Sequence, residues 1–396
     1  MKILKIGNIE KNYDDGTIVL KTIINRSDLG DFELQFRYNL NNLGYVDDTF
    51  SDSFIVSLLP YALEFGYDIE CINPISEELY YNLINNVIPT LSKYITYFKN
   101  IKIKPLSIKS EEMPAIKNGV ATGCSCGVDS FHTILMNYGN RNNLTTNTML
   151  TDLVVVNSGA CSWKGGEISK KWFNIEVERA KKVAEELGLG LITIDTNLME
   201  FYQCDHAHSG YSRICGTLIP LKRIIQRYYF ASGFEMSKFE FTLKTDGAYA
   251  YFILNEFSTV KLKFLLSGLI EERYDKVKFI EDFSIVKNHL NVCWNGGANC
   301  GKCEKCLRTI GAFYARNKLD EFSNVLNASY FNKHQFIGIA KMIYFSSQHK
   351  GQYKFLKDIK KRCFFKYWIA WNISFFIIHP IQLLKRIIRI FIKKRR

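Results

Sequence analysis

The fold is decided by the stretch Gly123-Cys124-Ser125-Cys126-Gly127-Val128-Asp129-Ser130. The apolar residues 120–122 before it read as the end of a strand, and residues 130–136 after it read as a helix. A tight turn between a buried parallel strand and a helix points backbone N–H groups at the space in front of the helix, where the helix dipole also favours an anion. We therefore predict a phosphate-binding turn here.

The side chains of this turn suit a phosphate. Gly127 lets the backbone approach a ligand closely, and the hydroxyls of Ser125 and Ser130 can donate to phosphate oxygens. Asp129 can cap the helix or hold a magnesium ion that bridges the phosphates. The turn lacks the lysine of a Walker loop, which argues against a P-loop NTPase. A small-residue turn that only caps a helix is the alternative.

The chain on either side of this turn alternates between strands and helices. Residues 153–156 form a continuous apolar run typical of a buried parallel strand, and residues 191–194 form another strand. Apolar residues at helical spacing predict helices over 168–187 and 214–228, and Pro220 predicts either a kink or a late start of the second helix. This alternation predicts an α/β fold with a parallel, doubly wound sheet covered on both faces.

The residues before this region predict a mixed α+β unit. Strands are expected at 17–20 and 32–36, a buried helix at 54–62, and another helix starting at Ser76. We predict four segments in the chain: an N-terminal unit (1–108), a nucleotide-binding domain (109–318), a helical extension (319–362) and a basic amphipathic tail (363–396).

Four of the eleven cysteines lie within fourteen residues, at Cys293, Cys300, Cys303 and Cys306. Four thiolates on a short segment that contains glycine suit tetrahedral zinc of the structural type. An iron–sulfur cluster could use the same ligands, and free or redox-active cysteines are a further alternative. The sequence predicts a four-cysteine zinc site within residues 293–306.

The chain resembles the PP-loop ATP pyrophosphatase superfamily, whose signature after the first strand is Ser-Gly-Gly-x-Asp-Ser/Thr. Ser125, Gly127, Asp129 and Ser130 match it, whereas Cys126 stands where the family usually has its first glycine. The cysteine cluster, followed by Arg308, is similar in layout to the zinc site of the 7-cyano-7-deazaguanine synthase family within that superfamily. The resemblance covers roughly residues 115–315.

The resemblance implies a HUP-type fold and an enzyme that binds ATP with Mg²⁺. Such an enzyme transfers AMP to a carboxylate or amide oxygen of its substrate, releases pyrophosphate, and then lets a nitrogen or sulfur nucleophile displace AMP. The residues implied to bind the nucleotide are Ser125, Cys126, Gly127, Val128, Asp129 and Ser130, of which Asp129 and Ser130 are implied to take part in catalysis. The substrate pocket of the deazaguanine enzymes has no residue-level match here.

Charge is distributed unevenly along the chain, whose formal net charge is +13 over 396 residues. Residues 341–396 contain fifteen basic residues and one acid, so the body of residues 1–340 carries −1. Hydrophobic residues make up 47% of the chain, which excludes a disordered protein. The first residues lack an apolar run of signal-peptide length, so the cytosol is the expected compartment.

The C-terminal tail combines apolar and basic residues. Residues 367–384 are almost wholly apolar, and in residues 385–396 bulky apolar residues are interleaved with basic ones. This pattern favours an amphipathic anchor on the inner face of a membrane with anionic lipids. A core helix with a solvated basic end and a nucleic-acid contact are the alternatives.

Three further signals are weaker. Asp205-His206-Ala207-His208 resembles a metal or acid–base cluster but is favoured as a polar loop, and Cys124 and Cys126 are favoured as packing residues. Arg273, Lys276 and Lys278 lie on a predicted helix and could face the nucleotide, although a solvated face is the default for such residues.

Three functions follow as hypotheses. The first is an adenylating enzyme at the membrane, whose substrate is a small molecule such as a surface-polysaccharide precursor. The second keeps this fold for modification of a 7-deazaguanine-type nucleobase or of nucleic acid. The third is a non-catalytic nucleotide-binding module in which Cys126 has weakened the turn.

Overall fold

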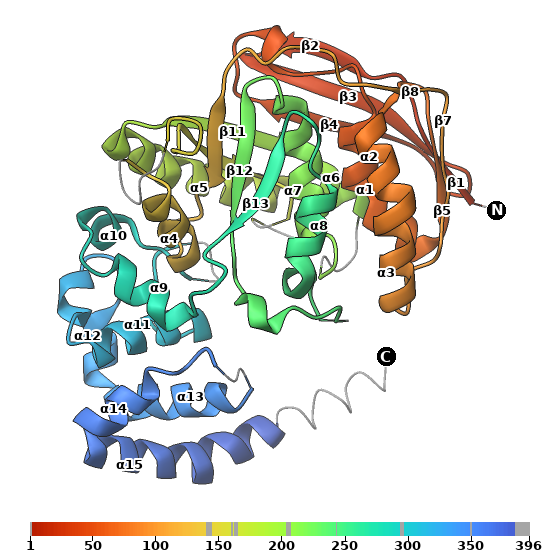
Figure 1. The fold of residues 1–396 in the computed structure, drawn as a ribbon. Coiled ribbons are helices and arrows are strands. Elements are labelled where there is room, and N and C mark those ends of the chain that lie inside the picture. Colours follow the sequence, from red (N-terminus) through yellow and green to blue (C-terminus); the bar gives the residue numbers. More distant parts are fainter. Residues whose placement is uncertain are drawn as a thin grey trace. The chain divides into compact units, whose positions relative to one another are not determined.

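The computed structural model describes residues 2–139, 145–159, 161, 165–202, 207–242, 244–293, 297–348 and 351–384. The chain forms two compact units (Figure 1). The first unit consists of Met1–Ser125 and Thr133–Ile270, and the second of Cys126–His132 and Glu271–Arg396. The domain boundary predicted at residue 108 thus falls inside the first unit.

Eleven strands of the described residues form one sheet in the first unit. Their bounds are β1 Lys2–Ile6, β2 Glu10–Asp14, β3 Thr17–Arg26, β4 Gly30–Tyr38, β5 Tyr67–Cys71, β7 Ile103–Pro105, β9 Gly119–Gly123, β10 Asp152–Val156, β11 Gly190–Thr196, β12 Ile225–Ala231 and β13 Lys263–Ser267. The order is β13-β12-β9-β10-β11-β4-β3-β1-β5-β7, and β2 pairs with β3. The predicted α/β class is therefore confirmed, with a sheet that is mixed and mostly parallel.

The predicted turn follows the central strand of the parallel part of this sheet. Strands β9 to β13 pair in parallel, and β9 lies between β10 and β12. From β9 the chain proceeds to β10 and β11 on one side and then returns to β12 and β13 on the other. In such sheets ligands bind beyond the carboxyl ends of the strands where this order reverses. That position lies at the end of β9, where the turn begins.

The N-terminal strands extend the same sheet. Strand β4 pairs antiparallel with β11, so that Tyr38 lies opposite Ile194. Strands β3 and β4 form a long hairpin, β1 pairs antiparallel with β3, and β5 and β7 continue in parallel beyond it. The expected α+β unit is present as secondary structure, and its strands share one sheet with the strands of the predicted nucleotide-binding domain.

Helices between these strands bury the core of the first unit. Their bounds are α1 Asp52–Phe65, α2 Glu77–Asn82, α3 Ile88–Tyr94, α4 Val128–Met136, α5 Gly166–Leu187, α6 Leu198–Tyr202, α7 Gly210–Leu218 and α8 Ala250–Glu256, and a small second sheet pairs β6 Ile75–Ser76 with β8 Ile108–Lys109. Helix α1 is buried along most of its length and packs against α7. A Cβ atom at Gly216 of α7 would lie 2.6 Å from the Ser53 carbonyl oxygen, so the two backbones approach closely.

One predicted helix is wrong in its second half. The helix expected over 214–228 ends as α7 at Leu218, a short 3₁₀ turn follows at Ile219–Leu221, and β12 begins at Ile225. Pro220 lies in that turn, where it cannot donate the hydrogen bond that a continuing helix needs. Ile225 and Tyr228, which fitted the helical spacing, instead face the core from a strand.

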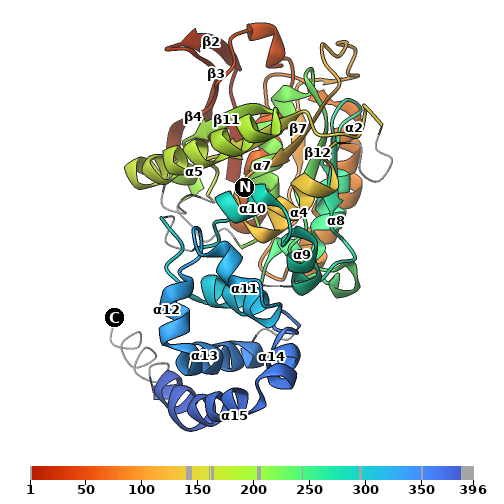
Figure 2. The same ribbon diagram turned by 90° about the vertical axis from the view of Figure 1, so that its left-hand side faces the viewer.

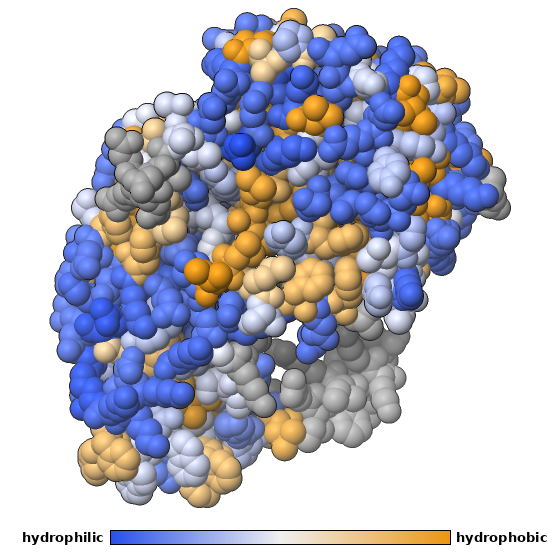
Figure 3. Space-filling model, in the orientation of Figure 1, coloured by the Kyte–Doolittle hydropathy of each residue, from blue (hydrophilic) through white to orange (hydrophobic). Residues whose placement is uncertain are grey.

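The second unit is helical (Figure 2). It contains the first turn of α4 and the helices α9 Arg273–Ile280, α10 Ser284–His289, α11 Glu304–Ala315, α12 Ala328–Lys333, α13 Gln335–Gln348, α14 Leu356–Arg362 and α15 Phe364–Ile373. A π-helical stretch, Ser374–Ile378, continues α15. Apolar side chains are visible along the lower edge of the molecule, over α15 (Figure 3). The residues 385–396 of the predicted tail lie outside the described residues.

Candidate functional site

The predicted turn connects the end of β9 to the start of α4. The Cys124 N–H donates to the Val154 carbonyl of the neighbouring strand at 2.9 Å, which anchors the start of the turn. The Phe131 N–H donates to the Gly127 carbonyl at 2.9 Å and opens the helix. Ser125 is exposed between these two anchors. The strand, turn and helix predicted from the sequence are therefore present.

Cys126 has a backbone conformation that is normally left to glycine. Its φ angle is +54°, in the left-handed region, and its side chain is fully buried. Non-glycine residues rarely adopt this region because the Cβ atom approaches the backbone. The Cys126 carbonyl accepts a hydrogen bond from the Asn291 N–H at 2.8 Å, which helps to hold the conformation. The cysteine thus keeps the turn in a shape that a glycine would adopt.

Asp129, in the first turn of α4, is bound by two basic residues of helix α9. Arg273 forms an ion pair with one carboxylate oxygen, and the Nζ atom of Lys276 lies 3.7 Å from the other. Burial raises the pKa of the Asp129 carboxyl, but the positive charges of Arg273 and Lys276 outweigh burial and hold that pKa below its usual value. Asp129 is therefore ionised at neutral pH.

Two basic residues of helix α11, Lys305 and Arg308, act on the same carboxylate. Burial and the positive charge of Arg273 lower the pKa of Lys305, and the same two causes lower the pKa of Arg308. We call Arg273, Lys276, Lys305 and Arg308 the cationic cluster. Lys305 and Arg308 are therefore both partly removed from water and close to another positive charge. A bound anion would stabilise the charged forms of both side chains.

The cationic cluster has donors without a protein acceptor. Among the described residues, no hydrogen-bond partner is present for the buried Nε atoms of Arg273 and Arg308. Arg308 uses its Nη1 atom to bind Gln352 of the same unit. A buried donor without a partner costs about 1–3 kcal/mol, more when it is charged. A phosphate group fits this donor set because guanidinium groups bind phosphate oxygens in forked geometry.

The two predicted phosphate-binding serines differ in exposure. Ser125 is exposed, whereas Ser130 is only 4% exposed. Next to them on α4, the His132 ring is 1% exposed and packs edge-on against Phe279. Burial, together with the charge of Lys276, lowers the pKa of His132 to about 4, so the ring is neutral. His132 is not among the site residues predicted from the sequence, although it lies only two residues after Ser130.

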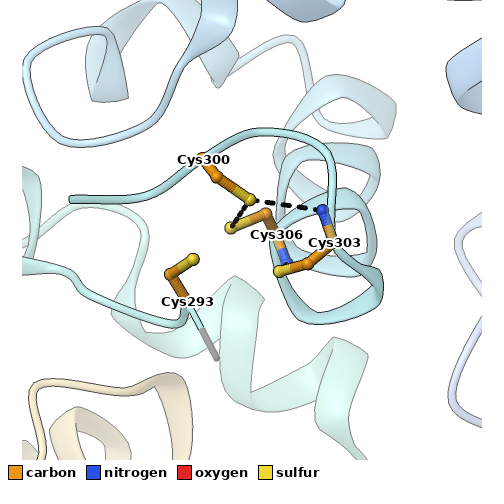
Figure 4. Close-up of side chains that lie close together, drawn as sticks. All are labelled: Cys293, Cys300, Cys303 and Cys306. Carbon is orange, nitrogen blue, oxygen red and sulfur yellow. Dashed lines mark hydrogen bonds between the residues drawn. The ribbon is translucent and has the colours of Figure 1, made fainter. Parts of the chain in front are cut away.

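The four cysteines predicted to bind metal lie together in the second unit (Figure 4). Their sulfur atoms all lie within 4.8 Å of one another, and those of Cys300 and Cys306 are 3.9 Å apart. A tetrahedral zinc ion with Zn–S bonds of about 2.3 Å places its sulfurs about 3.8 Å apart. The cluster could therefore hold a metal ion such as zinc.

Local backbone geometry positions these sulfurs. Backbone N–H groups of Lys302 and Cys303 donate to the Cys300 sulfur at 3.4 and 3.3 Å. Gly301 has a φ angle of +69°, which permits the reversal between these ligands. The buried Asn299 side chain donates to the Leu290 carbonyl at 2.8 Å and accepts from the Val292 N–H at 2.8 Å. These bonds fix the loop that carries the first ligand.

The cysteine cluster and the cationic cluster share one helix. Cys303 is the N-cap of α11 and Cys306 lies in its first turn, while Lys305 and Arg308 project from the same turn and the next. A metal ion bound by the cysteines would therefore fix the end of the helix that carries two of the four cations.

The sequence predicts that the basic residues of helix α9 face solvent. This prediction is correct for Lys278 and wrong for Lys276. Lys278 is exposed, and its Nζ atom pairs with Asp275 at 2.9 Å. Lys276, two residues earlier, is 2% exposed and faces Asp129. The sequence could not separate these two lysines, because what buries Lys276 is a carboxylate that lies far away in the chain.

The weaker histidine signal gives no metal site among the described residues. Asp205 and His206 lie outside the described residues. The ring of His208 is buried, and its Nδ1 atom lies 2.6 Å from the Tyr249 hydroxyl in the first unit.

No protein-family model, no curated protein and no solved structure matches this chain. The fold and the site therefore define only its class. It is an α/β protein whose mostly parallel sheet has a tight turn at its switch point, joined to a helical unit with a four-cysteine cluster that could hold a metal.

Proposed function

We propose that this protein is an ATP-dependent adenylating enzyme of the PP-loop type, which binds the phosphates of ATP in front of helix α4. The observation that carries the proposal is the cationic cluster around Asp129, with the unpartnered Nε atoms of Arg273 and Arg308. The switch-point position of the turn supports it, because this is where open α/β sheets bind their ligands.

The charge balance of the site favours a polyanion. Four cations surround Asp129, and the other carboxylates that act on the cluster are Glu271 and Glu304. Coulombic repulsion among cations that share a partly desolvated site is large. A pyrophosphate group would relieve that repulsion and accept hydrogen bonds from the guanidinium groups.

Magnesium fits this site only together with phosphate. Asp129 is already paired with two cations, so a bare divalent ion next to it would meet their repulsion. Mg²⁺ is commonly held by one or two carboxylates plus the phosphates of a substrate. Asp129 is the residue that would hold the ion, and the ion would supply charge neutralisation between the phosphate oxygens.

The proposed reaction is the one that the resemblance to the PP-loop superfamily implies. A carboxylate or amide oxygen of the substrate attacks the α-phosphorus of ATP, the new O–P bond forms, and the bond from that phosphorus to the bridging oxygen of pyrophosphate breaks. Negative charge develops on the leaving pyrophosphate, where Arg273, Lys276 and Arg308 can stabilise it. The chain thus contributes positioning and electrostatic stabilisation, and no general base is assigned.

The geometry of Cys126 bears on the alternative of a non-catalytic module. The alternative required that Cys126 had weakened the turn. Cys126 instead holds the left-handed conformation at φ +54° with a buried side chain. A glycine at this position would adopt the same conformation without strain.

The proposal is tested with pyrophosphate and with ATP on the full-length, zinc-loaded protein. Binding of inorganic pyrophosphate and of the non-hydrolysable α,β-methylene analogue of ATP with Mg²⁺ is measured by calorimetry. Release of pyrophosphate from ATP is then measured with a panel of small carboxylates and amides. We expect binding of both phosphate ligands, and pyrophosphate release with at least one member of the panel.

Lys276→Met and Lys278→Met form a matched pair on one helix. We expect Lys276→Met to weaken pyrophosphate binding at least tenfold and Lys278→Met to change it less than twofold. If neither phosphate ligand binds at millimolar concentration, the site is not a nucleotide site. If both bind but no pyrophosphate is released over a broad panel, the non-catalytic module replaces the enzyme.

A further inference from the structure

The last helix of the second unit is long and apolar. It runs over Phe364–Leu384, 21 residues with a mean hydropathy of 1.2, and only 11% of its most apolar window is buried. By length and composition it is the one helix among the described residues that could cross a membrane. The contacts of this helix and the charges next to it distinguish a helix that crosses a membrane from one that lies on its surface.

One face of this helix is used for packing within the second unit. Ala370 and Ser374 are buried, and the helix packs along α13, as both ribbon views show (Figures 1 and 2). Lys366 donates to the Gln335 side chain at the start of α13 at 2.9 Å, and the His379 ring packs edge-on against Tyr344. Polar and small residues therefore face the protein.

The opposite face is aromatic and exposed. Six aromatic side chains lie there at helical spacing, and each is between 45% and 70% exposed: Phe364, Phe365, Trp368, Trp371, Phe375 and Phe376. Neighbouring rings stack on one another, with centroids 5.4 Å apart for Trp371 and Phe375. Exposed apolar patches of this kind mark interaction sites on soluble proteins. We call these six residues the aromatic face.

The chain around the aromatic face is basic at both ends. Lys360, Lys361 and Arg362 precede the helix, and residues 385–396 contain seven basic residues and no acid. A second copy of this chain would bring one strongly positive surface against another, so charge disfavours self-association through this face. An anionic bilayer offers apolar depth for the rings and negative charge for the basic residues at once.

Two observations favour a helix that lies in the membrane surface over one that spans it. The small-residue face is already packed along α13, and a spanning helix would have to leave that contact. A span would also carry one of the two basic ends through the hydrocarbon core, where each charged residue is costly. Tryptophan side chains, as at Trp368 and Trp371, are enriched at the level of the lipid headgroups, which fits either kind of membrane helix.

We propose that the helix Phe364–Leu384 lies in the headgroup region of an anionic lipid bilayer, with its aromatic face directed into the lipid. The bilayer binds through the rings, and the basic residues on both sides of the helix add attraction to anionic lipid. This inference is independent of the proposed nucleotide chemistry, because it depends on residues outside the cationic cluster.

The test is flotation of the full-length protein with vesicles. We expect binding to phosphatidylcholine vesicles that contain about one third phosphatidylglycerol, and at least tenfold weaker binding to pure phosphatidylcholine. The variant Phe365→Ser/Trp368→Ser/Phe376→Ser should reduce binding to the anionic vesicles at least tenfold. The matched control Tyr81→Ser/Leu106→Ser/Val260→Ser changes three exposed apolar side chains of the first unit and should bind like the wild type.

Other occupants of the aromatic face are outcomes that overturn the proposal. A wild-type dimer in sedimentation that the aromatic-face variant converts to a monomer would assign the face to a second copy. If RNA displaces the wild-type protein from vesicles but does not displace the aromatic-face variant, the face would be assigned to nucleic acid. Protein that stays in cell membranes after alkaline carbonate extraction would make the helix a membrane span. Binding by the aromatic-face variant equal to wild type would remove the role of the rings.

Discussion

The sulfur of Cys303 accepts a hydrogen bond from the backbone N–H of Cys306 at 3.5 Å, so that one ligand of the cysteine cluster caps the helix that carries another. The same helical turn carries Lys305, and Arg308 follows it. We therefore expect the proposed metal binding and anion binding to be coupled through the start of one helix.

Loss of the metal should weaken anion binding. We expect Cys303→Ser to lower the zinc content of the purified protein below half of the wild-type value and to weaken pyrophosphate binding at least tenfold, because the N-terminus of α11 loses its anchor. Metal analysis and calorimetry measure both effects. Cys363→Ser, a cysteine outside the cluster, is the control and should leave both unchanged. Full zinc content in Cys303→Ser would contradict the assignment of this ligand.

The buried His132 should make stability depend on pH. Its pKa of about 4 in the folded protein lies below the 6.5 of an exposed histidine, so the unfolded state binds the proton more readily between these values. His132 therefore lowers the free energy of unfolding as the pH falls from 6.5 toward 4, by about 3 kcal/mol in total. Urea unfolding is measured at pH 7 and pH 5, with equal zinc content in both proteins. The free energy of unfolding should fall less between these pH values for His132→Phe than for the wild type. Equal losses would mean that the ring is not buried neutral.

The left-handed conformation at Cys126 predicts different effects on stability for two substitutions. Cys126→Gly relieves strain of about 1 kcal/mol but loses a buried side chain of similar worth, so we expect a change in the free energy of unfolding within about 1 kcal/mol. Cys126→Val keeps a Cβ atom and adds branching at a positive φ angle, and should destabilise the protein by more than about 2 kcal/mol. Chemical denaturation of both variants checks this. Equal stability of Cys126→Val and wild type would argue against the conformation.

The close approach of α1 and α7 should not tolerate a methyl group. A Cβ atom at Gly216 would overlap the Ser57 side chain and crowd the Ser53 carbonyl, so Gly216→Ala should cost about 2 kcal/mol or more. Gly233→Ala is the control, because a Cβ atom there meets no atom within 4 Å. Thermal unfolding should separate the two variants by several degrees.

The parts of the structure that are local in sequence could be predicted. The strands at 153–156 and 191–194 are continuous apolar runs, and the cysteines gather because their spacing and Gly301 bring them together within one short segment. Gly188 ends helix α5 in the left-handed conformation, directly after the predicted helix over 168–187.

The parts that depend on distant pairing could not be predicted. Nothing in residues 30–38 indicates that this strand pairs with β11, because an exposed strand edge has no distinct sequence signal. The burial of Lys276 depends on Asp129, more than a hundred residues earlier in the chain. The false helix over 225–228 arose because apolar residues in a buried strand can also fit a helical period.

The chain enters the helical second unit for seven residues, Cys126–His132, and does not return to it until Glu271. During synthesis, the first turn of α4 therefore emerges from the ribosome well before the helices that supply its cationic neighbours. At a synthesis rate of about 5–20 residues per second, this interval is on the order of ten seconds. Throughout that time the Asp129 carboxylate has none of its four basic neighbours, so the proposed phosphate site is assembled only after the strands of the sheet have been synthesised.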